Sequence, residues 1–433
     1  MNRGGGADPV TLRYAVNHLI QRELPSLKPS RVSQTGLLAG LATSDRRIVI
    51  IQPWIRLGGA ELVSLHLAHE LKRLGRQAVI VCSFVDLKGL PGWAEDLQYS
   101  LPPRWLAEGM QRSRILFLLL SPWVLLALVW KHSRNAWILN PHNFPATWVA
   151  SAIARLRRIP AVWFCNEPPT RLSLRDAWRV GLPDFMGWLV ASSWLDKLLV
   201  KRIADVCVPS TMTRLQVERR YQRPARVLHV GVDSEYFRAD DGSDPRLEFN
   251  LLGKFVLLCV GKLHPQKNQI VCLEALREVV GQIPEAVLVL AGDGPSAVGL
   301  KSAAAQWDLR EHVRFLGSVD SMTARRLYQA CDVNLIPAIN QSWGFTAFEA
   351  LCTGKVSVVS MSAGGAAEIL SENRIGVVCE PNGHAFAQAI LGLYRDRAEY
   401  ERLSNSGEEH VLRELTWHAF AKRTLEVFDE QVR

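Results

Sequence analysis

Two lysines in the second half of the chain have the charge needed to neutralise a diphosphate. Lys262 and Lys267 lie in a loop that follows a short apolar segment, and Gln341 follows another such segment. Lysine neutralises phosphate charge, and an amide both donates and accepts hydrogen bonds. Surface loops also contain lysines, so these residue types alone are weak evidence for a site.

The residues after Gln341 predict a helix that begins at the same place. The turn consists of Trp343, Gly344 and Phe345, and a helical stretch follows it. The first N–H groups of a helix are unpaired and partly positive, which suits a diphosphate. Glu349 lies about one and a half turns further on and could accept from two sugar hydroxyls. An ordinary helix with a solvated glutamate explains the same pattern equally well.

Three places in the first half also hold residues suited to a site. A Gly58-Gly59 pair at a strand-to-helix turn lets a ligand approach the backbone, although simple turn geometry also explains it. His142 follows an apolar strand-like segment and could bind a sugar hydroxyl, or be structural. Glu167 follows the next such segment and could contact an acceptor, or cap the helix after it.

Short apolar runs that alternate with helical stretches must position these residues. This order predicts an α/β fold with parallel sheets, in which a ligand lies beyond the carboxyl ends of the strands. The predicted strands are residues 47–51, 78–82, 136–139, 161–165, 205–209, 227–230, 255–260, 286–290, 313–317, 333–337 and 356–360. An amphipathic helix is predicted at residues 416–432.

The composition is that of a folded globular protein. The 433 residues are 48% hydrophobic and 21% charged, which is enough for two or three domains and argues against disorder. The net charge of +9 gives little support for nucleic-acid binding and fits anionic phosphates or a membrane surface better. The 8 cysteines show no zinc spacing and are expected to be buried, reduced thiols of a cytosolic protein. No signal peptide is evident at the N-terminus.

One apolar segment has basic residues at both ends. Residues 116–130 are expected to form a helix, and its flanks suit an interfacial helix near anionic lipid. A buried core helix with solvated ends is the alternative, and the segment from Ile115 to Trp130 is short for a membrane span. The flanking residues are Arg112, Arg114, Lys131, His132 and Arg134.

The stretch from Gln341 to Glu368 resembles the donor-site signature of retaining glycosyltransferases of family 4. In that family two glutamates eight positions apart bracket a Gly-Phe-Gly-like turn, with a Gly-Gly-x-x-Glu segment downstream. Glu349 matches the second glutamate, and residues 364–368 match the downstream segment. Gln341 stands where the first glutamate is expected, so a neutral amide replaces a carboxylate.

Other loops carry the same resemblance. The Gly58-Gly59 turn is similar to the glycine loop that closes on the donor. Gly261 and Lys262 resemble a Gly-Arg pair, with lysine in place of arginine, and Lys267 falls at the family's lysine spacing. Gly292 lies in a matching Gly-Asp-Gly-Pro turn, and Gly317 precedes a loop that borders the nucleobase in relatives. A histidine near the position of His142 and a Glu-Pro-Pro segment like that at Glu167 occur in relatives on the sugar and acceptor sides.

The resemblance implies the GT-B fold, in which two Rossmann-like domains face each other across a cleft and a C-terminal helix returns to the first domain. We expect an extension at residues 1–45, an acceptor-side domain at 46–235, a nucleotide-sugar domain at 236–415 and a crossover helix at 416–433. Lys262, Lys267, His142 and Gln341 are the expected catalytic residues. The expected donor-binding residues are Gly58, Gly59, Gly261, Gly292, Gly317, Trp343, Gly344, Phe345 and Glu349, and Glu167 is expected on the acceptor side.

The implied reaction is retaining, metal-independent sugar transfer from a nucleotide sugar to a glycan or lipid-linked acceptor. No cofactor, metal or nucleic acid is expected, and the predicted location is cytoplasmic, with peripheral contact at the inner face of an anionic membrane. A binding or regulatory protein that has lost catalysis is the main alternative, favoured by Gln341 and Lys262. A sugar-nucleotide epimerase fits the glycine and lysine loops less well, and neither a dinucleotide fingerprint nor a Walker A motif is present.

Overall fold

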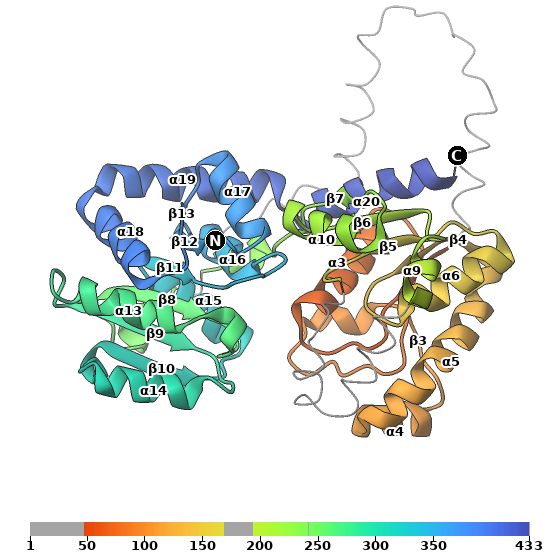
Figure 1. The fold of residues 1–433 in the computed structure, drawn as a ribbon, viewed down its shortest axis with the longest axis horizontal. Helices are drawn as coiled ribbons and strands as arrows, with labels where there is room; N and C mark the ends of the chain where they lie inside the picture. The colour runs from red at the N-terminus through yellow and green to blue at the C-terminus, as the bar shows by residue number, and fades with distance from the viewer. Residues whose placement is uncertain (1–46, 169–193, 241, 433) are drawn as a thin grey trace, which may run out of the picture. The chain divides into compact units, whose positions relative to one another are not determined.

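The computed structural model describes residues 47–168, 194–240 and 242–432, so the predicted extension at 1–45 lies outside the described residues. The described chain forms two Rossmann-like halves, each built on parallel strands (Figure 1). This confirms the predicted α/β class.

The second half is a six-stranded parallel sheet in the order β10-β9-β8-β11-β12-β13. The strand order reverses between β8 and β11, and this switch point is where ligands bind in such sheets. Helices cover both faces, so the strands read as continuous apolar runs. The strands are β8 Phe255–Val260, β9 Ala286–Ala291, β10 Val313–Gly317, β11 Val333–Ile336, β12 Val356–Ser360 and β13 Val377–Cys379. The longer helices are α13 Ile270–Val279, α14 Ala297–Gln306, α15 Ser321–Ala330, α16 Phe345–Cys352, α17 Gly365–Asn373, α18 Gly383–Arg395 and α19 Arg397–Glu414.

The first half repeats the plan. Its strands run in the orders β3-β2-β1-β4 and β5-β6-β7, and a parallel bridge between Leu139 and Ala161 joins the two groups. The strands are β1 Arg47–Ile51, β2 Ala78–Val81, β3 Tyr99–Ser100, β4 Ala136–Pro141, β5 Val162–Phe164, β6 Asp205–Val208 and β7 Arg226–Val227. The helices are α3 Gly59–Arg73, α4 Arg104–Arg112, α5 Arg114–His132, α6 Ala146–Arg157, α9 Trp194–Val200 and α10 Thr211–Tyr221.

One predicted strand is shorter than expected. Residues 227–230 were predicted as a strand, but β7 ends at Val227. Beyond it, the carbonyl of His229 accepts a hydrogen bond from Arg423 (3.2 Å), and Val232 pairs with Thr416. The chain therefore leaves the sheet because its backbone pairs with the C-terminal segment instead.

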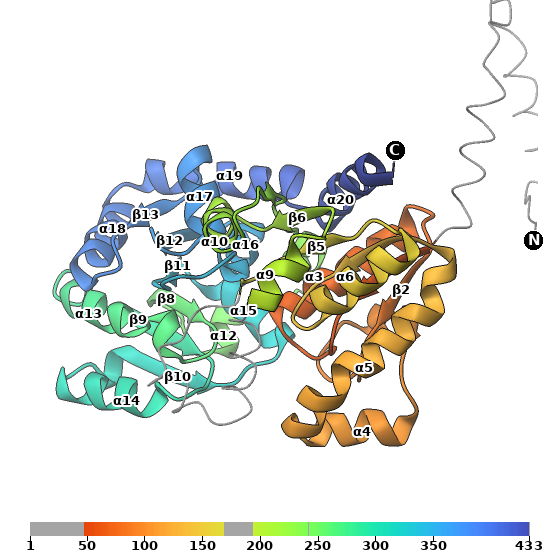
Figure 2. The ribbon, with the colours of Figure 1, turned by 45° about the vertical axis from the view of Figure 1, so that its right-hand side comes forward.

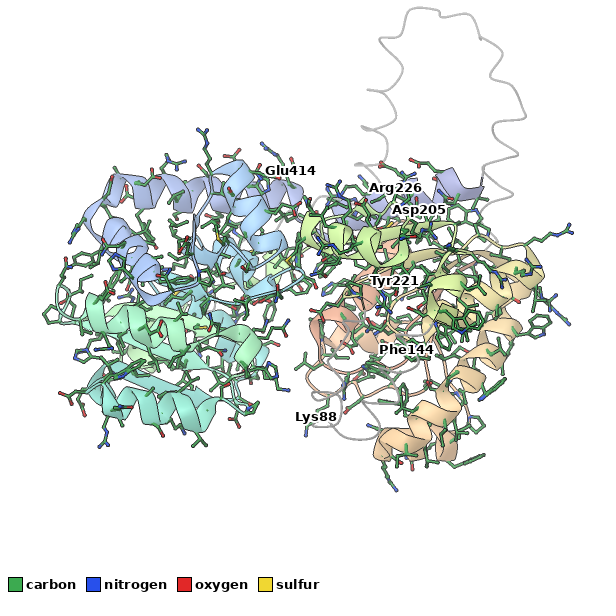
Figure 3. The ribbon with its side chains drawn as sticks, in the orientation of Figure 1. Lys88, Phe144, Asp205, Tyr221, Arg226 and Glu414 are labelled. Carbon is green, nitrogen blue, oxygen red and sulfur yellow. The ribbon has the colours of Figure 1, made fainter. Side chains whose placement is uncertain are left out.

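The C-terminal helix α20 (Trp417–Val432) packs on α3 and β4 of the first half, as predicted. Arg226 fixes it to the sheet, because this guanidinium reaches both Asp205 on β6 (2.6 Å) and Glu430 on α20 (2.7 Å). Asp205 and Arg226 lie together near this helix in Figure 3. Phe420 and Phe428 of α20 are fully buried in the apolar core of the first half, where Phe420 packs on Phe164.

The helices α4 and α5 lie on the outside of the first half (Figure 2). Leu125 and Val129 pack into the core, but Trp105, Leu119 and Trp123 are 74%, 62% and 70% exposed. The stretch Ile115–Asn135 is long and apolar enough to cross a membrane by length and composition, and only 17% of its most apolar window is buried. The interpretation as a buried core helix is therefore wrong, while one face of α5 does pack on the domain.

Candidate active site

The predicted lysine and glutamine come together at the switch point of the second sheet. Lys267 Nζ donates a hydrogen bond of 2.9 Å to Gln341 Oε1. Their loops are tied together, because Ile339 N donates to Gln266 O (2.9 Å) and Gln266 Nε2 donates to Asn340 O (3.0 Å). Two loops separated by more than 70 residues in sequence therefore form one surface.

The two predicted lysines differ in their surroundings. Burial lowers the pKa of Lys267, and the nearby carboxylate of Glu167 opposes this shift. Lys262 is exposed, and its side chain has no hydrogen bond or ion pair within the described residues. Lys267 is thus held by a protein partner, whereas the exposed side chain of Lys262 is free to move toward a ligand.

Helix α16 begins beside this pair. Gly344 has φ of 94°, a conformation that favours glycine, and it turns the chain into the helix. A Cβ at Gly344 would lie 3.3 Å from Gln341 Nε2, so the helix start adjoins the glutamine side chain. The amides of Phe345 and Thr346 open α16 and have no partner within the helix, so they are suited to an anion, whereas Ala347 N already donates to Gly344 O (3.1 Å).

The indole of Trp343 lies in the core. Trp343 is 5% exposed and packs on Phe348 and His229, with ring centroids 4.8 and 5.7 Å apart. Its predicted contact with the donor would therefore come from its backbone.

Glu349 is held by a residue that the sequence analysis did not identify. Tyr328 Oη, on the buried side of α15, donates a 2.7 Å hydrogen bond to Glu349 Oε2. Burial raises the pKa of Glu349 to about 7, although this hydrogen bond opposes the shift. A tyrosine on the apolar face of a helix is typical of packing, so the sequence carried no signal for this role.

Three of the predicted glycines meet at the carboxyl ends of β8, β9 and β10. Gly292 N donates to Gly317 O (2.7 Å), and Gly261 N donates to Ala291 O (2.9 Å). Gly292 has φ of 150°, and a Cβ there would lie 2.0 Å from Gly261 O. Only glycine permits this approach, so the three loops form one compact edge.

The glycine loop of the first half reaches the start of α16. A Cβ at Gly59 would lie 3.2 Å from the Phe345 ring. Next to Gly58, the Trp54 indole donates to the buried carboxylate of Glu61, whose pKa is raised by burial. The predicted glycine loop and the predicted helix start are therefore neighbours in space.

His142 is buried with a defined tautomer. Asn140 Nδ2 donates to Val162 O (2.8 Å), so Asn140 Oδ1 must accept the 2.9 Å hydrogen bond from His142 Nε2. His142 Nδ1 is then an acceptor, and it has no hydrogen-bond partner among the described residues. Burial lowers the pKa of His142 to about 3, so the imidazole is neutral near pH 7. Asn140 was not predicted, because an asparagine at a strand end is also common in turns.

Acidic side chains connect the two halves. Ser342 Oγ donates to Glu167 Oε1 (3.3 Å), which brings the predicted acceptor-side carboxylate next to the Gln341 loop. Glu368, from the downstream segment, accepts from Thr211 N (2.7 Å) and Thr211 Oγ1 (2.8 Å) and lies 3.4 Å from His229 Nε2. Burial would raise the pKa of Glu368, but these hydrogen bonds outweigh it and lower the pKa.

The described residues contain no group of three or more His, Cys, Asp or Glu side chains that could hold a metal ion. All eight cysteines are free, and all but Cys379 are fully buried.

Two family models match the chain in the order of its two halves. The model described as Glycosyltransferase Family 4 matches residues 57–236. The model described as Glycosyl transferases group 1 matches residues 246–410, which include every predicted donor residue of the second half.

Curated relatives and solved structures agree with these models. D-inositol 3-phosphate glycosyltransferase 2 of Catenulispora acidiphila is 30% identical over 48% of this chain and 52% of that protein. GDP-mannose-dependent alpha-(1-6)-phosphatidylinositol monomannoside mannosyltransferase of Mycobacterium tuberculosis is 27% identical over 62% of this chain and 77% of that protein. The chain spans about half the length of several curated relatives that it matches.

The fold also matches that of solved structures. The structure of Anabaena HepE in complex with UDP superimposes with a TM-score of 0.68, at 18% identity over 89% of this chain and 100% of that one. The two family models and the two Rossmann-like sheets together show that the chain belongs to the GT-B glycosyltransferases of the family 4 type.

Proposed function

We propose that this protein transfers a sugar, with retention and without a metal, from a nucleoside diphosphate sugar to an acceptor hydroxyl. The hydrogen bond between Lys267 and Gln341, beside the start of α16, is the observation that carries the proposal. It gathers a cation, a neutral polar group and free helix amides around one point.

Each side chain then has a defined task. Lys262 and Lys267, with the amides at Gly344 and Phe345, stabilise the negative charge that develops on the leaving diphosphate. These cations take the part that a metal ion plays in other transferases. Glu349, oriented by Tyr328, accepts from the ribose hydroxyls.

The sugar lies between Gln341 and the first half of the chain. The free acceptor atom, Nδ1 of His142, is suited to a hydroxyl of the donor sugar. The bond between the anomeric carbon and the phosphate oxygen breaks, the acceptor oxygen bonds to the same face, and the acceptor proton passes to the leaving phosphate. No protein nucleophile is required in this scheme.

Glu167 supports the acceptor side. Its carboxylate approaches the Gln341 loop through Ser342 and acts electrostatically on Lys267. It brings a negative charge to the region in which Gln341 supplies none, and it can accept a hydrogen bond from the incoming hydroxyl.

The acceptor is a glycan or lipid-linked glycan at the cytoplasmic face of a membrane. The exposed apolar side of α5 supports this location, since Leu119 and Trp123 would otherwise face water. The first turns of α5 adjoin the active-site loops, because Phe117 packs edge-to-face on Trp54 at 5.3 Å. The mycobacterial relative is itself named for a phosphatidylinositol mannoside acceptor.

The test is a panel of nucleotide sugars, with calorimetry for binding and product analysis for turnover. GDP-mannose and UDP-glucose belong in the panel, since the relatives and neighbours are named for GDP-mannose and UDP. We expect saturable binding of one donor and an α-linked product from an α-linked donor. A β-linked product would contradict retention, and unchanged turnover after exhaustive chelation is expected if no metal takes part.

A catalytically silent binding protein is the second candidate, and the neutral Gln341 is the observation that favours it. Donor binding without hydrolysis or transfer across the whole panel would support it over the enzyme.

A further inference from the structure

A second polar surface lies at the amino ends of β4, β5 and β6, on the edge of the sheet opposite to His142 and Glu167. An open cavity of about 440 Å³ is lined by Arg134, Arg157 and Ile159, with the start of β4. A cavity of about 300 Å³ shares Ile159 and is lined by Arg155 and Arg202. Arginines from three separate segments therefore line two adjoining hollows, two arginines to each hollow.

These arginines have no acidic partners. Arg134, Arg155 and Arg202 are exposed and Arg157 is half-buried, and none of the four forms an ion pair within the described residues. The sequence contains no Asp or Glu between Glu108 and Glu167. A guanidinium group that forms an ion pair usually stabilises the fold. Several guanidinium groups that line a hollow without acidic partners attract an anion.

Helix polarity alone does not explain the cluster. Arg155 and Arg157 lie in the last turn of α6, where a positive charge complements the helix dipole. Arg134 and Arg202 lie two residues beyond the ends of α5 and α9, where helix polarity also favours a positive charge. Helix polarity does not explain why the ends of three separate helices bring their arginines to adjoining hollows.

The cluster is continuous with the exposed apolar side of α5. The Arg157 guanidinium lies 3.8 Å from the ring centroid of Trp130, in the last turn of that helix. Trp130 is partly exposed, and Leu119 and Trp123 lie on the same helix. An indole beside cations at the end of an apolar helical surface matches the headgroup level of a bilayer.

We infer that the surface formed by these two adjoining cavities, with Arg134 and Arg157 in one and Arg155 and Arg202 in the other, binds the phosphate of an anionic phospholipid headgroup. The guanidinium forks hold the phosphate oxygens, Trp130 lies at the level of the glycerol backbone, and the apolar side of α5 enters the acyl boundary. This site rests on the proposed membrane location, but it is separate from the donor site and binds a lipid that is not consumed.

The test compares full-length variants with equal changes in net charge. Arg155→Glu/Arg202→Glu, the cavity variant, reverses both charges of the smaller cavity, and Arg219→Glu/Lys422→Glu reverses two exposed charges on α10 and α20. Sedimentation with phosphatidylcholine vesicles, with and without phosphatidylglycerol, reports binding. We expect the cavity variant to lose at least about tenfold in affinity for the anionic vesicles, and the control to lose less than about threefold.

Several outcomes would overturn the inference. Equal losses in the two variants would mean that only overall charge matters. Binding of soluble glycerol phosphate as tight as that of vesicles would indicate a free phosphate site, and preferential binding of an RNA oligomer would indicate nucleic acid. Turnover with a soluble acceptor should be unchanged in the cavity variant, so a wild type that binds vesicles but lacks turnover would refute only the proposed reaction.

Discussion

The carboxyl edges of the two sheets differ in how many contacts hold their predicted site residues. In the second half, Lys267 already contacts Gln341, Tyr328 holds Glu349, and three glycine loops bond to one another. In the first half, His142 keeps a free acceptor and Glu167 is exposed. The comparison teaches that the donor-side groups are held by contacts with one another, whereas the opposite side combines an exposed carboxylate with a buried acceptor atom that has no partner among the described residues.

Loss of the lysine should have the largest effect. Lys267→Ala removes a positioned cation from the leaving phosphate and should lower turnover by on the order of a hundredfold or more. Steady-state rates with the best donor measure it. Lys254→Ala, at the opposite end of β8, is the control and should keep wild-type activity. Near-normal turnover in folded Lys267→Ala protein would remove this residue from the site.

Substitutions of Gln341 test whether a neutral side chain at this position is sufficient for sugar transfer. Gln341→Glu should retain activity within roughly tenfold, a difference of about 1.4 kcal/mol, if the contact is a hydrogen bond to a sugar hydroxyl. Gln341→Ala should lose more, because Lys267 and the sugar are left without a partner. An inert wild type combined with an active Gln341→Glu variant would show that the natural protein is a silenced transferase.

The pKa of Glu349 predicts a pH dependence of donor affinity. Only the ionised carboxylate accepts from both ribose hydroxyls, so nucleotide affinity should fall by up to about tenfold per pH unit below about 7. Calorimetry with the nucleoside diphosphate across this range measures it. Glu349→Gln should flatten the profile, and a flat wild-type profile would contradict the assignment.

The carboxyl group of Glu349 should also make the free energy of unfolding fall as the pH rises. Between pH 4.5 and about 7 the folded protein holds a proton on Glu349 that the unfolded chain has released. This contribution to the free energy of unfolding is present below pH 4.5 and is lost as the pH rises through about 7. Denaturant unfolding of wild type and Glu349→Gln without ligand would show whether the slopes differ.

The smallest effect is expected for vesicle binding by the exposed apolar side of α5. Leu119→Ser should weaken binding to anionic vesicles roughly fivefold, since a partly inserted leucine loses about 1 kcal/mol of burial. Leu215→Ser is the matched control, because Leu215 is 56% exposed on α10 and outside the α4–α5 surface. Binding should also weaken with added salt. Equal sedimentation with neutral and acidic lipid at low salt would contradict an interfacial α5.

The sequence predicted the elements of the second half and most of its loops. Lys267 and Gln341 could be assigned to one site because their loops resemble the donor site of the family, and the structure places both loops after strands that flank the switch point. The contact of Thr211 with Glu368 could not, because it joins residues 157 positions apart in different halves. Trp343 shows another limit: an aromatic residue in a glycine-rich turn suggests exposure, yet packing against Phe348 buries it.

The docking of α20 also constrains the order in which the protein can fold during synthesis. Phe420 and Phe428 fill the core beside β4 and β5, so the first sheet lacks part of its interior until residues 417–432 have left the ribosome. In the second half, the core cluster around β8, β9, α13 and α18 contains no residue beyond Leu403. The half that is translated first therefore completes its packing last, and it depends on the nascent chain being protected from aggregation while it waits.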